Sequence, residues 1–244
     1  MSDESTTIRE ALPIEVPLER VTDPRLYRWF EVSLVLLVSF GSSILNSLYL
    51  LRNGRVTSPY LEDFRWTISI LQELTALLLL AYVLSRRRMR LRDLGLRWSF
   101  GDLGTGLIVT FASYLTYAMG YSFVHSIHRA MFSSASSGLT PREIFAHPSM
   151  MAVPLFLLNP FFEELIVRAY LMTEVRDLTG SWTLSAALSI AVQFSYHLYY
   201  GWERAIAMSF PFLVFSIYYA NTRKVTPIIV AHGIFDIYGL IRLW

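Results

Sequence analysis

Residues 159–168 read NPFFEELIVR, and this stretch governs how the rest of the chain is interpreted. It places two carboxylates, Glu163 and Glu164, and one guanidinium, Arg168, inside an apolar run of membrane-spanning length. Ionisable side chains at bilayer depth cost about 3 kcal/mol each on insertion scales, so they persist where they are paired or used. Residues four apart share one face of a helix, which predicts that Glu164 pairs with Arg168 while Glu163 is free. A purely structural ionic staple of all three residues is the alternative.

Pro160 predicts where this helix starts. Proline has no N–H and cannot continue a helix without losing a hydrogen bond. Asn159 before it is a typical N-cap residue, and proline is favoured at the first helical position. We therefore expect the helix to restart or kink at Pro160. Glu163 would then lie in the first turn of the new segment, where the helix dipole favours a carboxylate.

The composition is that of a helical membrane protein. Of the 244 residues, 54% are hydrophobic and 16% are charged, whereas soluble proteins are about 25% charged. The chain has no cysteine, which excludes disulfides, thiol nucleophiles and cysteine-ligated metals. No basic segment is interleaved with aromatic residues, so nothing indicates nucleic-acid binding. The predicted fold class is all-α, a polytopic transmembrane helical bundle.

Apolar runs predict about seven spans, because about 20 apolar residues cross the hydrocarbon core as a helix. The spans are expected near residues 30–51, 66–84, 103–124, 150–172, 183–200, 205–220 and 225–243. Residues 1–26 are mixed in charge and contain no apolar run, so they are expected to form a soluble N-terminal arm. The transmembrane domain would cover residues 27–244, with the motifs that carry chemistry in residues 150–244.

The stretch 86–97, RRRMRLRDLGLR, orients the predicted bundle. Arginines interspersed with leucines are typical of a segment that lies on the anionic cytoplasmic leaflet, and a plain positive-inside stop signal is the equal alternative. Both interpretations place this stretch, and with it the N-terminus, in the cytoplasm. We expect a multi-pass integral protein of a prokaryotic plasma membrane, or of an ER-type membrane if the host is eukaryotic.

Residues 125–149 form the longest loop predicted after the N-terminal arm. The serine-rich stretch 133–138 is expected to be flexible, and residues 140–143 have the spacing of a capping box that predicts a short surface helix. Three histidines lie in or beside this loop, at a spacing that matches no metal motif. We interpret them as surface histidines: His125, His128 and His147.

Further polar side chains fall inside the predicted spans. Glu73 needs a partner or a wet cavity, and a hydrogen bond to a neighbouring helix is the expected solution. His197 follows Gln193 by one turn on the same face, and His232 precedes Asp236 at the i, i+4 spacing that lets the carboxylate orient the imidazole. Two histidines and a free glutamate from three separate spans predict a shared polar site.

These motifs also resemble a known family. The EExxxR motif of residues 163–168, the histidine-bearing span and the HxxxD motif of residues 232–236 resemble the CPBP family, the Abi or type II CAAX prenyl endopeptidase group. The resemblance covers roughly residues 150–244, and residues 93–96 are also similar. The family usually has phenylalanine four residues before the middle histidine, where this chain has Gln193. The resemblance implies an all-helical intramembrane endopeptidase whose first glutamate activates water and whose histidines complete the site.

The residue types suit peptide hydrolysis, which needs a base for water, charge stabilisation for the oxyanion and an acid for the leaving amine. Glu163 is the expected base, His197 would hold the water, and His232 would donate to the oxyanion or the leaving group. An ionised Asp236 only accepts hydrogen bonds, so it is assigned to orienting His232. The expected catalytic set is Glu163, His197, His232 and Asp236, supported by Glu164, Arg168 and Gln193.

Zinc is the alternative to a site without cofactors. Glu163, His197 and His232 form a two-histidine, one-carboxylate set of the kind that binds catalytic zinc. The chain lacks the HExxH motif, which preorganises such a site on one helix. If Glu163 bound the metal, no acid of the motifs would remain as the base. We therefore expect no cofactor.

The expected partners are the lipid bilayer and a membrane-anchored protein or peptide substrate, CAAX-like or other, and no nucleic acid. Two other functions stay open at this stage. One is a non-proteolytic membrane scaffold or immunity protein of the same fold, which the intact Glu163, His197 and His232 disfavour. The other is a transporter with helix breaks at Pro160 and Pro211 and with Glu73 as a coupling carboxylate. The lack of a repeat between the two halves of the chain disfavours it.

Overall fold

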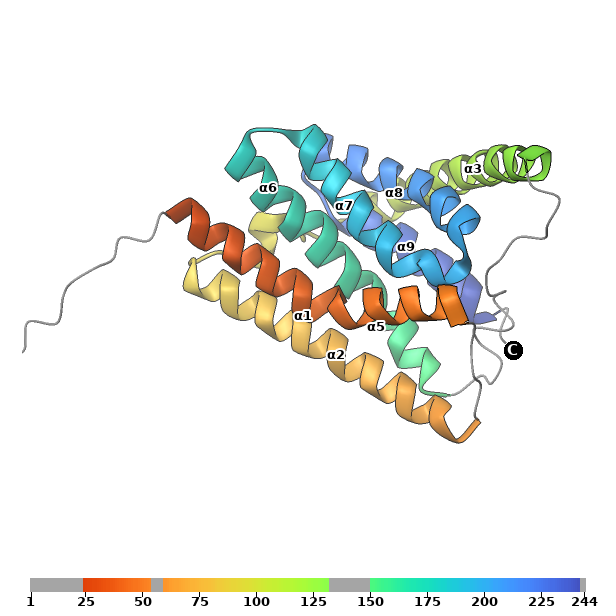
Figure 1. The fold of residues 1–244 in the computed structure, drawn as a ribbon. Coiled ribbons are helices and arrows are strands. Elements are labelled where there is room, and N and C mark those ends of the chain that lie inside the picture. Colours follow the sequence, from red (N-terminus) through yellow and green to blue (C-terminus); the bar gives the residue numbers. More distant parts are fainter. Residues whose placement is uncertain (1–23, 54–58, 132–149, 242–244) are drawn as a thin grey trace, which may run out of the picture.

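The structure, a computed structural model, describes residues 24–53, 59–131 and 150–241 (Figure 1). Every regular element in these ranges is a helix, which confirms the all-α prediction. In chain order the elements are α1 (Pro24–Asn53), α2 (Pro59–Arg86), η1 (Leu91–Leu94), α3 (Phe100–Met131), α5 (Ala152–Glu163), η2 (Glu164–Leu171), α6 (Met172–Thr179), α7 (Trp182–His197), η3 (Leu198–Tyr200), α8 (Trp202–Thr222) and α9 (Thr226–Ile241).

The described helices lie where the seven spans were predicted, and four of them have the length and apolarity of a membrane span. Within the described ranges, α1, α2, α3 and α8 are long and apolar enough to cross a membrane, and α9 is a shorter apolar helix. The elements α5, η2 and α6 follow one another without a gap and form one rod, here called the central helix. Large apolar side chains are exposed along α1, α2 and α3, as expected where lipid covers them. The chain is therefore an integral membrane protein.

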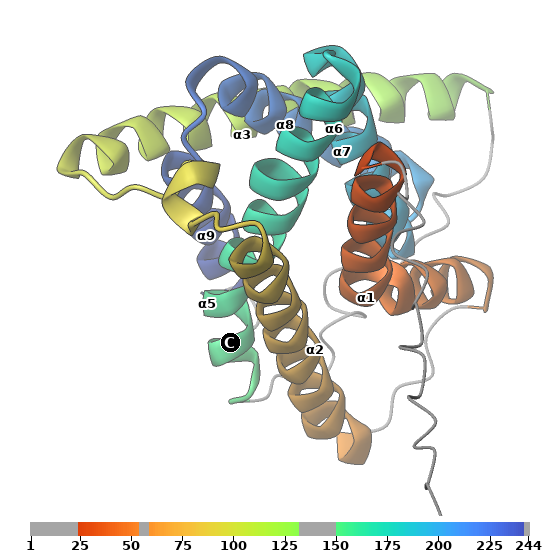
Figure 2. The ribbon, with the colours of Figure 1, turned by 90° about the vertical axis from the view of Figure 1, so that its left-hand side faces the viewer.

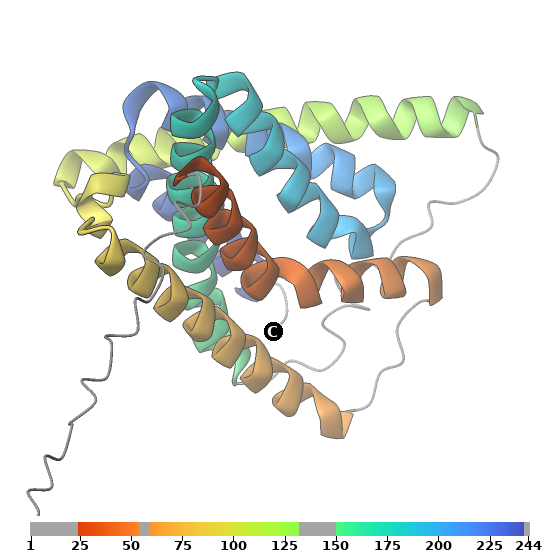
Figure 3. The same ribbon diagram turned by 60° about the vertical axis from the view of Figure 1, so that its left-hand side comes forward.

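The central helix is surrounded by the other helices. α2 packs against α5, α7 packs against α6 and η2, and α9 packs against α5. α1 packs on α2 and α7, whereas α3 packs on α8 and α9. Figures 2 and 3 show α3 on the opposite side of the bundle from α1 and α2. Side chains of the central helix can consequently meet residues from almost every other part of the bundle.

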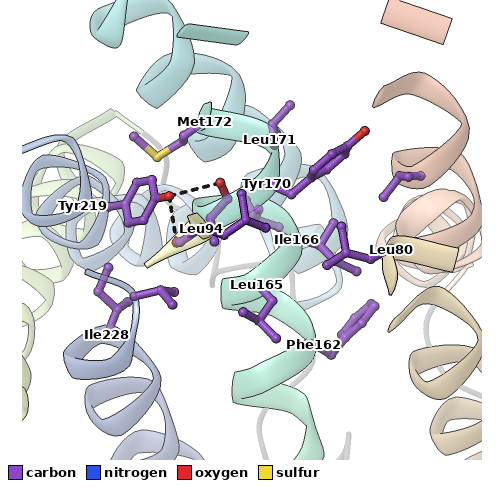
Figure 4. Close-up of a cluster of buried hydrophobic side chains, with 14 of the residues drawn as sticks. Leu80, Leu94, Phe162, Leu165, Ile166, Tyr170, Leu171, Met172, Tyr219 and Ile228 are labelled. Atoms are coloured by element: carbon purple, nitrogen blue, oxygen red, sulfur yellow. Dashed lines mark hydrogen bonds between the residues drawn. The ribbon is translucent and has the colours of Figure 1, made fainter. Parts of the chain in front are cut away.

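The core lies around this central helix. Every residue of η2 is buried, as expected for a helix that is enclosed on all sides. In Figure 4, Leu165 and Ile166 of η2 lie among Leu80 from α2, Tyr219 from α8 and Ile228 from α9. The polar residues of the EExxxR motif are therefore held inside an apolar core.

The central helix does not restart at Pro160, so that part of the prediction is wrong. Pro160 lies inside α5, which begins at Ala152, and the irregular segment is η2, a π-helix that starts at Glu164. Proline is tolerated inside membrane helices because packed neighbours compensate for the missing hydrogen bond. Glu163 consequently ends α5 instead of standing in a first turn, so the helix-dipole argument does not apply to it. π-helical turns inside α-helices occur frequently at functional sites.

The arginine-rich stretch 86–97 is anchored in the bundle. Leu94 is fully buried, and the hydroxyl of Tyr219 donates a hydrogen bond of 3.0 Å to its carbonyl oxygen (Figure 4). Gly95 has a φ of 90°, and a Cβ atom there would collide with the carbonyl oxygen of Arg223. Glycine is thus required for both the conformation and the close approach.

One of the loop-side histidines is buried, contrary to the prediction. α3 extends to Met131, beyond the predicted end at residue 124, so these histidines lie on its last turns against α8. His128 is 6% exposed, and its Nδ1 contacts a carboxylate oxygen of Glu203. His125 is more exposed and lies 3.6 Å from the same carboxylate. Other predictions fall outside the described residues: those for 1–23 of the arm, the serine-rich stretch 133–138, the capping box at 140–143 and His147.

Candidate active site

The four residues predicted as catalytic line one cavity of about 860 Å³. Glu163 comes from the end of α5, His197 from the end of α7, and His232 and Asp236 from α9. Most of the remaining wall is aromatic or aliphatic, with contributions from α2, α3, η3 and α8. The structure thus brings together side chains from three helices that the sequence predicted to share a polar site.

Glu163 has partners, so the expectation that it is free is wrong. The residue is 6% exposed. The hydroxyl of Tyr196 donates a hydrogen bond of 2.6 Å to Glu163 Oε2, and Gln193 Nε2 donates one of 3.3 Å to the same oxygen. Oε1 accepts no hydrogen bond from the described residues. One carboxylate oxygen is therefore held while the other is left for chemistry.

Arg168 is fully buried and ties the central helix to α7 and α8. Its Nη1 donates to Ser189 Oγ at 2.9 Å, and its Nη2 donates to Gln193 Oε1 and, at 3.3 Å, to the carbonyl oxygen of Phe212. The predicted pair with Glu164 is present, with 3.8 Å between Nε and Oε2. This distance exceeds that of a hydrogen bond, because the two terminal nitrogens of the guanidinium are directed to α7 and α8.

Glu164 is shared between Arg168 and a histidine, which corrects the view that it serves Arg168 alone. Glu164 Oε1 lies 2.8 Å from His232 Nδ1. The other ring nitrogen, Nε2, lies 3.6 Å from Asp236 Oδ1. Asp236 also accepts a hydrogen bond of 3.0 Å from Asn159 Nδ2, so Asn159 holds this carboxylate instead of capping a helix. Both ring nitrogens of His232 face carboxylates, an arrangement that suits an imidazolium with two N–H donors.

His197 has one ring nitrogen fixed by the backbone. Its Nδ1 lies 2.8 Å from the carbonyl oxygen of Gln193. A carbonyl only accepts hydrogen bonds, so Nδ1 carries the hydrogen and a neutral ring has its lone pair on Nε2. The half-buried ring also contacts Phe212, with 5.2 Å between the ring centroids. His197 therefore offers the cavity a hydrogen-bond acceptor in a defined orientation.

Glu73 of α2 is a further buried acid. It is 7% exposed, and its Oε2 has no hydrogen-bond partner among the described residues. The expected hydrogen bond to a neighbouring helix is thus not found there. Glu73 lies within electrostatic range of Glu163, His232 and Asp236, but it is not among the residues that line the cavity.

The structure groups different metal donors from those that the sequence suggested. Among the described residues, the three whose carboxylate or imidazole ligand atoms lie within 4.8 Å of one another are Glu163, Glu164 and His232. Glu164 thus takes the place of His197 in the predicted zinc set. In the observed arrangement Glu164 is bonded to His232, and Glu163 to Tyr196. His197, the second histidine of the predicted zinc set, lies outside this group.

Sequence reasoning missed Tyr196 and the contact of Asn159 with Asp236. The sequence does contain a pattern that identifies the polar face of α7. Ser189, Gln193 and His197 recur every four residues, which places them on one face of a helix. Ser189 and Gln193 bond Arg168, and Tyr196, three residues after Gln193, lies beside that face. A lone tyrosine in an apolar span gave no comparable signal.

The comparisons with known proteins agree with the geometry. Residues 145–238 match the family model described as type II CAAX prenyl endopeptidase Rce1-like. The matched range contains all four cavity residues predicted as catalytic and confirms the resemblance drawn from the motifs. Comparisons with curated proteins and with solved structures gave no match. The family implies a membrane protease that acts on peptide substrates. Residues 145–238 of this chain are thus similar to the Rce1-like type II CAAX prenyl endopeptidases.

Proposed function

We propose that this protein is an intramembrane endopeptidase that hydrolyses membrane-associated polypeptides with a water molecule activated by Glu163. One observation carries the proposal. Glu163, His197 and His232 line a single cavity inside a membrane bundle, and Glu163 keeps one carboxylate oxygen without a hydrogen bond from the described residues. This combination supplies a base, an acceptor for water and a donor for the oxyanion.

The proposed reaction starts with water between Glu163 and His197. Glu163 Oε1 takes one proton of the water, whose other hydrogen is held by the lone pair on His197 Nε2. The water oxygen forms a bond with the carbonyl carbon of the scissile peptide, and the carbonyl electrons move onto its oxygen. The C–N bond then breaks, and the proton on Glu163 passes to the leaving amine. Atoms and charges balance over the cycle, and Glu163 is regenerated as a carboxylate.

His232 is proposed to stabilise the oxyanion. An imidazolium can donate a hydrogen bond to the developing negative charge. Glu164 holds its Nδ1 at 2.8 Å, and Asp236, itself held by Asn159, lies 3.6 Å from Nε2. The distance to Asp236 is longer than a hydrogen bond, so the Nε2 proton is available to a substrate oxygen that approaches more closely.

We propose a metal-free reaction instead of a zinc mechanism, because each residue of the site then has one role. Glu163 acts as the base, His197 holds water, and Glu164 and Asp236 orient His232. The hydrogen bonds of Tyr196 to Glu163 and of His232 to Glu164 support this assignment, because a metal on those oxygens would have to displace them.

The proposed substrates are membrane-anchored polypeptides, cut near a terminus or within a lipid-facing segment. The largely apolar cavity wall supports this class, because it matches side chains that partition into the bilayer. CAAX-like tails are one member of the class. The transporter alternative loses its proposed helix breaks, since Pro160 and Pro211 both lie inside helices.

The test uses protein in lipid vesicles with a panel of membrane-anchored reporter peptides. We expect the wild-type protein to cut at least one reporter and Glu163→Gln to lower the rate by about 10²–10⁴-fold, the contribution of a general base. Asp177→Asn is the matched control, because it makes the same change on α6 at a partly exposed acid outside the cavity. Equal rates for wild type and Glu163→Gln, or no cleavage of any reporter, would contradict the proposal and favour a non-proteolytic scaffold.

A further inference from the structure

Tyr196 connects the proposed base to a helix outside the family match. Its side chain is buried, and its hydroxyl donates a 2.6 Å hydrogen bond to Glu163 Oε2. Its ring stacks on Phe40 of α1, with 4.8 Å between centroids and 5° between the planes. The ring of Phe40 also meets that of Phe162, at 5.1 Å. Phe40 therefore contacts both the tyrosine that bonds Glu163 and the residue that precedes Glu163.

α1 holds the same segment at a second point. The backbone N–H of Tyr199 donates a hydrogen bond of 2.8 Å to Ser47 Oγ of α1. Tyr196 and Tyr199 lie on either side of His197 in the chain, so α1 fastens the histidine-bearing turn both before and after the histidine. Phe40 and Ser47 lie outside residues 145–238, the range that the family model matches.

A carboxylate that works as a base must present one oxygen in a fixed direction. The terminal torsion of glutamate has a broad energy well, so an unrestrained carboxylate samples many orientations. Two donors, Tyr196 and Gln193, hold Glu163 Oε2. The direction of Oε1 is then set by the direction of Oε2. Small errors in the placement of a reacting group are costly to the rate.

We propose that Tyr196 is a positioning residue for the Glu163 carboxylate and that α1, through Phe40, holds Tyr196 in that role. This inference rests on the proposed function of Glu163. It assigns α1 a part in the reaction although α1 contributes no side chain to the lining of the cavity.

The first experiment compares steady-state cleavage of a membrane-anchored reporter by variants in lipid vesicles. Tyr196→Phe removes one hydrogen bond to a charged group, so we expect kcat to fall by about 10- to 100-fold with KM unchanged. Tyr170→Phe is the control, because Tyr170 is also buried and its hydroxyl has no hydrogen-bond partner in the described chain. We expect the control to keep wild-type kcat. A Tyr196→Phe variant with wild-type kcat, or with a raised KM alone, overturns the proposal.

The second comparison tests the part played by α1. Phe40→Leu removes the stacked ring and leaves the Tyr196 hydroxyl in place, so kcat should fall by less than in Tyr196→Phe. The double variant should be no slower than Tyr196→Phe alone, since Phe40 acts through the tyrosine. Additive losses in kcat would contradict the coupling through Tyr196.

Thermal unfolding in detergent tests the interaction between Tyr196 and Glu163 without a cleavage assay. Tyr196→Phe should lower the Tm of the wild-type protein but not that of Glu163→Leu, in which the acceptor is already missing. Equal losses in both backgrounds overturn the proposal. If the wild-type protein cuts no reporter, the proposed function fails while this cycle still decides whether Tyr196 acts through Glu163.

Discussion

The two adjacent glutamates should respond differently to the same substitution. Glu164→Gln removes a charge from a side chain that is 0% exposed and that lies 2.8 Å from His232 Nδ1 and 3.8 Å from Arg168 Nε. Removing one partner of a buried ion pair costs about 3–5 kcal/mol. Arg168 keeps its hydrogen bonds to Ser189, Gln193 and the Phe212 carbonyl, so the lower end, about 3 kcal/mol, applies. At about 2–4 °C per kcal/mol for a chain of this size, Tm should fall by about 6–12 °C.

Glu163→Gln should behave in the opposite way. The amide keeps the shape of the side chain and can still accept from Tyr196, so only the charged character of two hydrogen bonds is lost. A neutral hydrogen bond contributes about 1 kcal/mol and a charged one somewhat more. The expected loss of about 1 kcal/mol corresponds to a Tm decrease of about 2–4 °C. Cleavage should nevertheless slow by about 10²–10⁴-fold, because an amide cannot take a proton from water.

The assay pairs thermal unfolding in detergent, followed by tryptophan fluorescence, with reporter cleavage on the same preparations. Glu164→Gln should also cleave more slowly than wild type, since His232 loses the charge that orients it, but it should keep measurable activity. If Glu163→Gln proves the less stable of the two, or if Glu164→Gln is the inactive one, the roles assigned here are reversed.

Three other predictions can be checked separately. Chelator-washed protein should contain no zinc by metal analysis and should keep full activity. One tightly held zinc per chain, with activity lost on its removal and restored on its return, would overturn the metal-free mechanism. Accessibility labelling should find residue 90 on the cytoplasmic side and residues 133–138 outside, and labelling of both from one side would contradict the topology. Glu73→Leu should raise Tm because it removes a buried acid without a hydrogen-bond partner in the described chain, whereas Glu31→Leu should lower Tm because it leaves Arg87 with one carboxylate partner fewer. A lower Tm for Glu73→Leu would show that its carboxyl is bonded within the protein.

Much of the architecture could be predicted from the sequence because it depends on local properties. Apolar runs of spanning length predicted the position of each helix, since an apolar run of that length is stable across the bilayer wherever it occurs in the chain. Motif spacing selected Glu163, His197, His232 and Asp236, and the i, i+4 rule placed Glu164 near Arg168 and Asp236 near His232. These inferences need only the geometry of one helix.

The contacts between helices were decided by the tertiary structure alone. Tyr196 bonds Glu163, Asn159 bonds Asp236, and His232 takes Glu164 as a partner. Each of these depends on the rotation of one helix against another, which periodicity within a single helix cannot specify. The restart at Pro160 was wrongly predicted for the same reason. The hydrogen bond that proline cannot donate is a local loss, whereas packed neighbouring helices compensate for it. The sequence alone thus selected the candidate residues for the chemistry, and packing around the buried central helix decided which of their atoms face the cavity.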